Sequence, residues 1–144
     1  MVMINYLLIC DSHGFTHFNK AFTEKYNKLD YDLFGGFLSA LTQVGNALFQ
    51  KTLAKVLFGE NLNEIITIIT KEFFDKEYKI YFIFLTEKDI PFKKLRGISD
   101  GIYIHIRALV CNNTANRENG RIEEKINNFL TNLKFEDNEE IKIF

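Results

Sequence analysis

The eight residues from Gly45 to Thr52, GNALFQKT, differ by one residue from a phosphate-binding loop. The P-loop pattern is G-x-x-x-x-G-K-[ST], and Gln50 stands where the second glycine belongs. A working P-loop follows a strand, and its backbone wraps phosphate at the start of a helix. Here the apolar periodicity upstream places the stretch at the end of a helix, where backbone carbonyls repel phosphate. We therefore expect no nucleotide site around Lys51.

A second stretch, CDSH from Cys10, places nucleophiles, a carboxylate and a base in a row. Catalytic triads are assembled in space from separated residues, because adjacent residues on a turn point apart. We interpret the stretch as a turn in which Asp11 accepts backbone N–H bonds and Gly14 adopts a positive φ. His13 and His17 lie four residues apart, but on a hairpin rather than on one helical face, so a metal pair is not expected.

The remaining polar candidates also have simpler interpretations. His105 lies in an isoleucine-rich segment, where we expect a hydrogen-bonded or half-exposed side chain rather than a ligand or base. Lys93, Lys94 and Arg96 form a basic cluster at a helix start. This cluster is either a solvated face or a contact for an acidic partner or lipid headgroup. The sequence thus predicts no catalytic, cofactor-binding or metal-binding residues.

Composition limits the class of protein. The 144 residues suffice for one domain, and the net charge of −1 with scattered signs is unlike a nucleic-acid binder. The two cysteines show no CxxC pair, which indicates a reduced, cytoplasmic protein. The N-terminal apolar run is too short for a signal peptide or a membrane span. We therefore expect membrane contact only through a partner.

Periodicity divides the chain into the strands and helices of an α+β fold. A single domain over residues 1–134 and a loosely held acidic tail over 135–144 are expected. The domain should hold a five-stranded, antiparallel-type sheet flanked by helices. We expect strands over 4–10, 15–20, 53–58, 65–73 and 78–86, and helices over 33–50, 91–109 and 122–133. Residues 102–107 also alternate like a strand, although the length of the segment and Pro91 near its start favour helix.

The helix over 33–50 is the most informative segment, because it contains no charged residue. We expect Asp32 to be its N-cap and its apolar stripe to face the core; the stripe comprises Leu33, Phe34, Phe37, Leu38, Leu41, Val44 and Leu48. The opposite face carries small, uncharged residues, and interface centres are depleted of charge. We therefore predict a protein interface at Gly35, Gly36, Ser39, Gln43 and Asn46. The alternative is an ordinary solvent face that lacks charge by chance.

The expected order β-β-α-β-β-β-α-α resembles the longin domain from about Ile4 to Leu133. The stretches INYLLICDSHG, DLFGGFLSAL and YKIYFIFLTEKD carry the resemblance. The related roadblock fold begins with an extra helix that this chain lacks. The Ile-, Lys- and Asn-rich composition is most similar to stand-alone longin-like proteins of archaea.

The resemblance implies a non-enzymatic platform that dimerises and binds or regulates small GTPases, as in membrane trafficking. Its partner would be a small GTPase, another longin- or roadblock-like chain, or a second copy. No heptad segment follows the domain, so a role in membrane fusion is not expected. The alternative class is a small-molecule sensor or an enzyme with a pocket near the Asp11–Gly14 turn.

Overall fold

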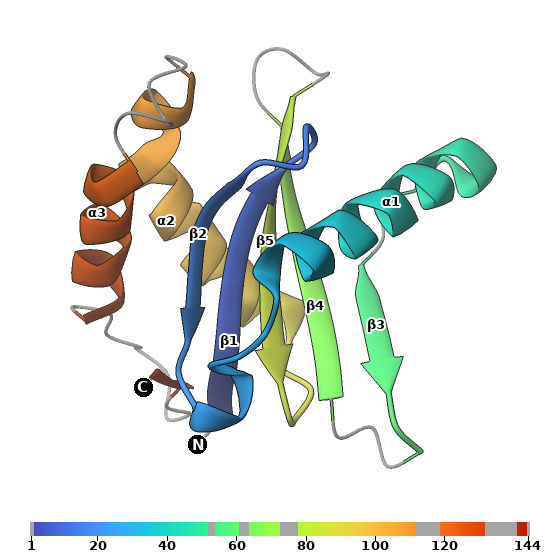
Figure 1. Cartoon of the computed structure of the whole chain (residues 1–144), viewed down its shortest axis with the longest axis horizontal. Helices are drawn as coiled ribbons and strands as arrows, with labels where there is room; N and C mark the ends of the chain where they lie inside the picture. The colour runs from blue at the N-terminus through green and yellow to red at the C-terminus, as the bar shows by residue number, and fades with distance from the viewer. Residues whose placement is uncertain are drawn as a thin grey trace.

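The computed structural model describes residues 2–51, 54–60, 64–72, 78–111, 119–131 and 141–143 (Figure 1). The described elements are β1 (Val2–Asp11), β2 (Thr16–Ala21), the 3-10 helix η1 (Glu24–Tyr26), α1 (Tyr31–Phe49), β3 (Lys55–Phe58), β4 (Glu64–Glu72), β5 (Lys79–Thr86), α2 (Phe92–Cys111), α3 (Asn119–Thr131) and β6 (Ile141–Ile143). The α+β class is confirmed. The order differs from the expected one by the addition of η1 and β6.

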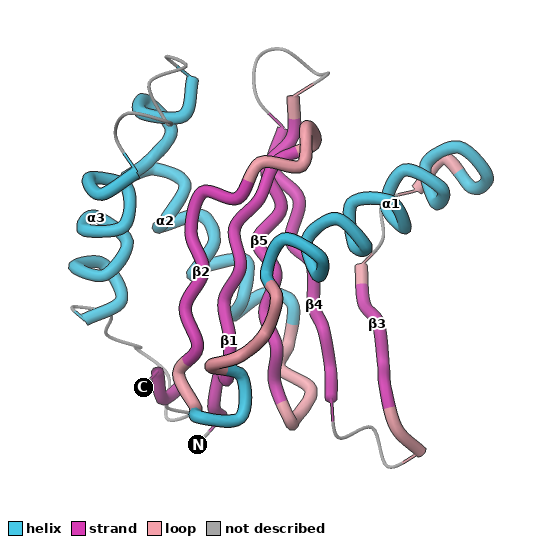
Figure 2. Tube along the Cα trace, in the orientation of Figure 1, coloured by secondary structure: helices cyan, strands magenta, loops and turns pink. Residues whose placement is uncertain are grey.

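Five strands form an antiparallel sheet in the order β2-β1-β5-β4-β3. Alternate residues of β1 point to opposite faces, as the two-residue period of a strand requires. Leu7 and Ile9 join a core cluster with α2 and α3, whereas Leu8 and Cys10 join a second cluster with Leu38 of α1. The sheet is therefore the middle of three layers, with α1 on one face and α2 and α3 on the other (Figure 2).

Residues 102–107 lie within α2, which resolves the sequence ambiguity in favour of helix. Ile102 and Ile106 are fully buried one turn apart, whereas Ile104 between them is 61% exposed. That spacing is helical rather than strand-like. Where α2 meets α3, a side chain at Gly101 would place its Cβ only 2.2 Å from Cζ of Phe129. The bare glycine backbone thus lets the Phe129 ring pack directly onto α2.

One prediction at an element end is corrected. The N-cap of α1 is Asp30 and not Asp32, because the helix begins at Tyr31 and Asp30 Oδ1 accepts the N–H of Leu33 at 3.1 Å. In the tail that was expected to be loosely held, 141–143 form β6, parallel to the first residues of β1. The ten-residue β1 extends past the end of β2, so it leaves room beside Val2 to Ile4 for this short strand. Residues 135–140 lie outside the described part.

The prediction for the buried face of α1 is wrong. The residues that α1 buries are Gly35, Leu38, Ser39 and Thr42. Of the expected core stripe only Leu38 is buried; Phe34 and Leu41 are half-buried, and Leu33, Phe37, Val44 and Leu48 are exposed. Small side chains let the helix backbone approach the sheet, and a Cβ at Gly35 would lie 3.5 Å from Leu8 Cδ2. The side of α1 with small and polar residues thus packs against the sheet, and its apolar side faces solvent.

Candidate functional site

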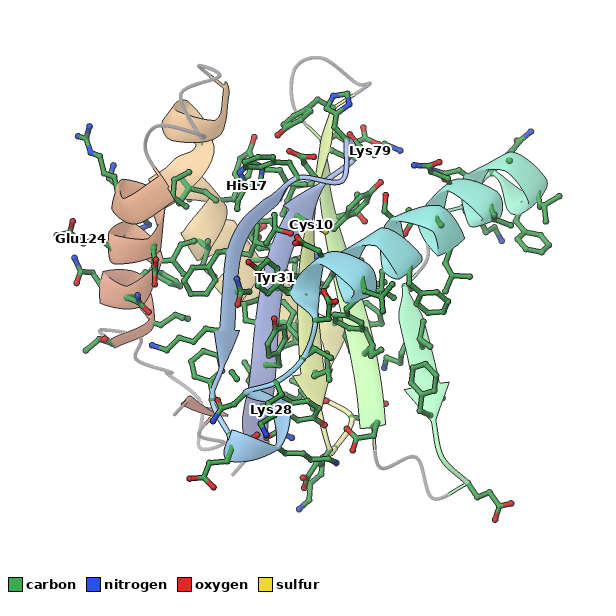
Figure 3. All side chains as sticks on the ribbon, in the orientation of Figure 1. Cys10, His17, Lys28, Tyr31, Lys79 and Glu124 are labelled. Carbon is green, nitrogen blue, oxygen red and sulfur yellow. The ribbon has the colours of Figure 1, made fainter. Side chains whose placement is uncertain are left out.

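The apolar side of α1 and the edge strand β3 form an exposed apolar surface, here named the α1–β3 surface. Its members share large apolar side chains that are about half exposed or more: Leu33 73%, Phe37 50%, Val44 52%, Leu48 70%, Phe49 70% and Phe58 47%. Scattered exposed apolar residues are normal, whereas large apolar side chains gathered along one side of a helix, such as Leu33, Phe37, Val44 and Leu48, are typical of interaction surfaces. Side chains stand off the far end of α1, which projects past β3 (Figure 3).

A cavity of about 760 Å³ lies beside the projecting end of α1. It is lined by Leu41, Val44, Gly45, Phe49, Lys51, Ala54 and Lys55. Lys55 is engaged elsewhere, because its Nζ lies 2.5 Å from Asp89 Oδ1 and 5.0 Å from the centre of the Phe92 ring. Lys51 is the other charged residue of the lining, and the remaining five residues are apolar.

The five residues predicted to form the interface do not share one exposed patch. Gly35 and Ser39 are buried against the sheet, Asn46 is half-buried, and only Gly36 and Gln43 are exposed. The expected buried and exposed faces of α1 were largely reversed, so its apolar stripe faces solvent while part of the small-residue stripe packs on the sheet. The observation that motivated the prediction still holds, because no charge interrupts the sequence from Leu33 to Gln50.

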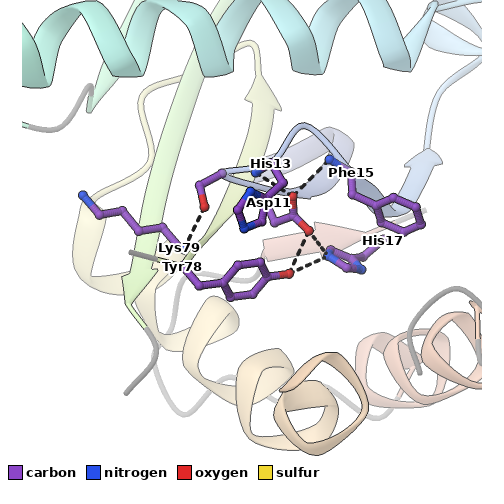
Figure 4. Close-up of polar contacts among 7 residues, drawn as sticks. Asp11, His13, Phe15, His17, Tyr78 and Lys79 are labelled. Atoms are coloured by element: carbon purple, nitrogen blue, oxygen red, sulfur yellow. Dashed lines mark hydrogen bonds and ion pairs between the residues drawn. The ribbon is translucent and has the colours of Figure 1, made fainter. Parts of the chain in front are cut away.

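Asp11 is the centre of a buried polar cluster at the β1–β2 turn (Figure 4). Its Oδ1 accepts the N–H groups of His13 at 2.9 Å and Phe15 at 3.0 Å. Its Oδ2 lies 2.8 Å from His17 Nε2 and accepts the hydroxyl of Tyr78 at 2.7 Å. An ionised carboxylate only accepts hydrogen bonds, so His17 donates through Nε2. The cluster ties the hairpin to the start of β5.

The environment of Asp11 favours its charged form. Burial of the carboxyl acts to raise the pKa of Asp11. Hydrogen bonds from His17, Tyr78 and the N–H of Phe15, with the nearby His17 charge, outweigh burial and lower that pKa below its ordinary value. The Asp11 carboxylate therefore works as an acceptor that holds the turn.

A β-bulge brings His17 into the cluster. The register between β1 and β2 shifts between Ile9 and Cys10, which leaves His17 without a direct partner on β1. Bulges re-aim side chains in this way. The contact with Tyr78 could not be inferred from the sequence, because 67 residues separate Asp11 from Tyr78. The predicted turn is confirmed, with backbone N–H bonds to Asp11 and a φ of 83° at Gly14.

The neighbouring residues of the CDSH stretch do not converge on a reacting atom. Burial, and secondarily the charge of Asp11, raises the pKa of the Cys10 thiol to about 12, so the nucleophilic thiolate is disfavoured. Cys10 belongs to the α1-side core, whereas Ser12 Oγ accepts the N–H of Lys79 at 3.1 Å. His13 stacks on the Tyr78 ring, with centroids 5.4 Å apart. Among the described residues, no group of three His, Cys, Asp or Glu side chains is arranged for a metal ion.

The other sequence candidates lie apart from both features. The described part of GNALFQKT, from Gly45 to Lys51, covers the last turn of α1 and its cap, as expected. His105 Nδ1 lies 2.7 Å from the carbonyl oxygen of Gly101 one turn earlier in α2. Lys93 and Arg96 are exposed on the first turns of α2.

Neither the models of known protein families nor the sequences of curated proteins match this chain. The described helices are also too short or too polar to cross a membrane. The α1–β3 surface and the Asp11 cluster are therefore the features from which function must be inferred.

Proposed function

We propose that this protein is a non-enzymatic interaction module whose binding site is the α1–β3 surface. The observation that carries the proposal is the orientation of α1. The helix packs its small residues on the sheet and leaves Phe37, Val44 and Leu48 exposed to solvent. Exposing such a group to water is unfavourable, and covering it by a partner recovers the hydrophobic free energy. A partner would bury no charged side chain from Leu33 to Gln50, so it avoids the cost of desolvating one.

The resemblance to longin domains supplies the class of partner. The five-stranded antiparallel sheet, with one helix on one face and two on the other, supports a longin-like domain. We infer that the module dimerises or joins another longin- or roadblock-like chain, and binds or regulates a small GTPase in a trafficking-type process.

The experiment compares two substitutions at adjacent positions of α1. Val44→Glu places a charge on the apolar stripe, whereas Gln43→Glu places the same charge on the exposed polar flank. Each tagged chain is purified from the source cell with a GTP analogue or with GDP. We expect a small GTPase to accompany the wild type and Gln43→Glu, and to be reduced about tenfold or more with Val44→Glu. If Val44→Glu keeps every partner of the wild type, the α1–β3 surface is not the binding site.

A small-molecule sensor is the second candidate. The observation that favours it is a cavity of about 340 Å³ on the β2 edge near the Asp11 cluster. It is lined mainly by polar residues: Thr16, His17, Phe18, Asn19, Tyr31 and Glu123. The size suits a small polar ligand, and Glu123 would favour a cationic one.

A further inference from the structure

We propose that the cavity on the outer edge of β2 binds a small compound with a primary ammonium group, which Glu123 of α3 and His17 of β2 hold between them. This inference rests on the small-molecule candidate for function and does not involve the α1–β3 surface. The evidence is the position of the cavity, a buried nitrogen of His17 and the charge of the residues that line the cavity.

The cavity lies where both helical layers reach the edge of the sheet. β2 is the terminal strand, and four consecutive residues of it, 16–19, line the cavity. Because successive side chains of a strand point to opposite faces, a cavity lined by all four extends along the free edge of the strand. Tyr31 at the start of α1 and Glu123 of α3 complete the lining. The volume of about 340 Å³ is near the lower limit for ligand sites, so the ligand is small.

The β2 backbone contributes hydrogen-bonding groups to this edge. The N–H of Phe22 donates to the carbonyl of Asn5 at 2.9 Å, so Phe22 faces β1. The register of β2 with β1 is regular from Phe18 to Ala21, and inward and outward residues alternate along an antiparallel pair. The N–H and C=O of Asn19 therefore point away from β1. Since Asn19 also lines the cavity, its carbonyl is one acceptor that a ligand can use.

His17 contributes a second acceptor. Its side chain is 2% exposed, and Nε2 lies 2.8 Å from Asp11 Oδ2. The other ring nitrogen, Nδ1, is buried and has no hydrogen-bond partner among the described residues. With the proton of a neutral imidazole on Nε2, Nδ1 carries a lone pair and can only accept. A ligand that donates a hydrogen bond to Nδ1 would satisfy this acceptor, which otherwise keeps its cost of desolvation.

Glu123 makes the lining negative. One turn later on the same side of α3, Asn127 Oδ1 accepts Lys20 Nζ of β2 at 2.9 Å, so this side of α3 faces β2. Lys20 also lies over the Phe22 ring, 5.5 Å from its centre. Within the described part of the chain, Glu123 forms no ion pair, and the lining contains no lysine or arginine. The lining therefore favours a cation and repels an anion.

An ammonium group fits this lining better than other cations. A metal ion would need more ligands, and the described residues hold no group of three His, Cys, Asp or Glu side chains for one. An ammonium carries three N–H donors, which match a carboxylate oxygen of Glu123, Nδ1 of His17 and a backbone or hydroxyl oxygen. Tyr31, which is 40% exposed, adds an aromatic ring that can attract a cation.

The test is an NMR titration of the isotope-labelled full chain with two amines, ethanolamine and putrescine. Ethylene glycol and butanediol are the neutral controls of matching length. Glu123→Gln removes the proposed charge, and Glu124→Gln is the matched control, because the Glu124 side chain points away from the sheet (Figure 3). We expect saturable shifts of the amide signals of residues 16–19, with a Kd about tenfold higher or more for Glu123→Gln and unchanged for Glu124→Gln. The ring Nδ1 signal of His17 should move as the amine binds.

Three outcomes overturn the inference: no saturable shift with either amine up to about 10 mM, equal shifts with the diols, or equal affinity of Glu123→Gln and the wild type. A constant Nδ1 signal at saturation overturns it as well, because His17 would then not contact the ligand. These outcomes are separate from those for the α1–β3 surface, since Val44→Glu should bind both amines as the wild type does. Failure of amine binding with the GTPase association intact contradicts only the ammonium site, and the converse contradicts only the interaction module.

Discussion

Asp11→Asn should lower the free energy of unfolding by about 2–4 kcal/mol at neutral pH. The side chain keeps its shape, and its oxygen can still accept backbone N–H bonds. Its amide group, however, would meet the donors of His17 and Tyr78, which now share one acceptor oxygen, Oδ2. A buried donor that faces another donor keeps its desolvation cost without a compensating bond. Urea unfolding of the wild type and the variant measures the difference.

The effect of Asp11→Asn should depend on pH. Because folding lowers the pKa of Asp11, its carboxylate contributes stability in full above the unfolded value of about 3.9 and loses it as pH falls through the folded value. The difference between wild type and Asp11→Asn should therefore narrow in strong acid. Asp89→Asn is the matched control, because its side chain is 66% exposed and pairs with Lys55 at the surface. That substitution should change stability by less than about 1 kcal/mol. Equal effects for the two substitutions would show that the cluster does not stabilise the fold.

Gly101→Ala should destabilise the protein by about 1–3 kcal/mol, although alanine is the better helix former. The added methyl group would lie 2.2 Å from Phe129 Cζ, so the ring or the whole of α3 must shift. Gly97→Ala is the control on the same helix, because nothing lies within 4 Å of its added Cβ. This change should be neutral or stabilise by up to about 1 kcal/mol.

A second substitution shows whether the contact with Phe129 is the cause. Phe129→Leu removes the ring atoms that the new methyl group would meet, so Gly101→Ala should cost much less in that background. A double-mutant cycle by thermal or chemical unfolding measures the coupling. Additive effects of the two substitutions would contradict the packing described for α2 and α3.

The sequence predicted the elements better than their relative placement. Local signals, such as the apolar run before Asp11 and the helical spacing of Ile98, Ile102 and Ile106, act within a few residues and were sufficient to place strands and helices. The prediction of the buried face of α1 was wrong, because hydrophobicity alone assigns the apolar stripe to the core. The hydrophobic pattern does not show how closely Gly35 and Ser39 let the α1 backbone approach the sheet. It also does not show the direction in which α1 crosses the sheet. Both depend on contacts far apart in the chain.

For the candidate sites, too, the sequence predicted what depends on local signals and missed what depends on contacts far apart in the chain. The turn at Asp11 was predictable, because Asp and Gly have local backbone preferences. The pairing of Asp11 with Tyr78 was not, since it depends on the register between β1 and β5. The absence of charge from Leu33 to Gln50 drew attention to α1, but two of the residues predicted to form the interface, Gly35 and Ser39, are buried.

Hydroxyl-radical footprinting of the full chain tests the central claim most directly, because it reports the solvent exposure of individual side chains. The experiment compares dilute chain, concentrated chain and chain mixed with any GTPase that co-purifies with it. Phe15, which is 36% exposed at the β1–β2 turn, is the internal control. The account predicts that oxidation of Phe37 and Phe49 falls on association while that of Phe15 is unchanged. Oxidation of Phe37 and Phe49 at one constant rate under all three conditions would contradict a role of the α1–β3 surface in binding.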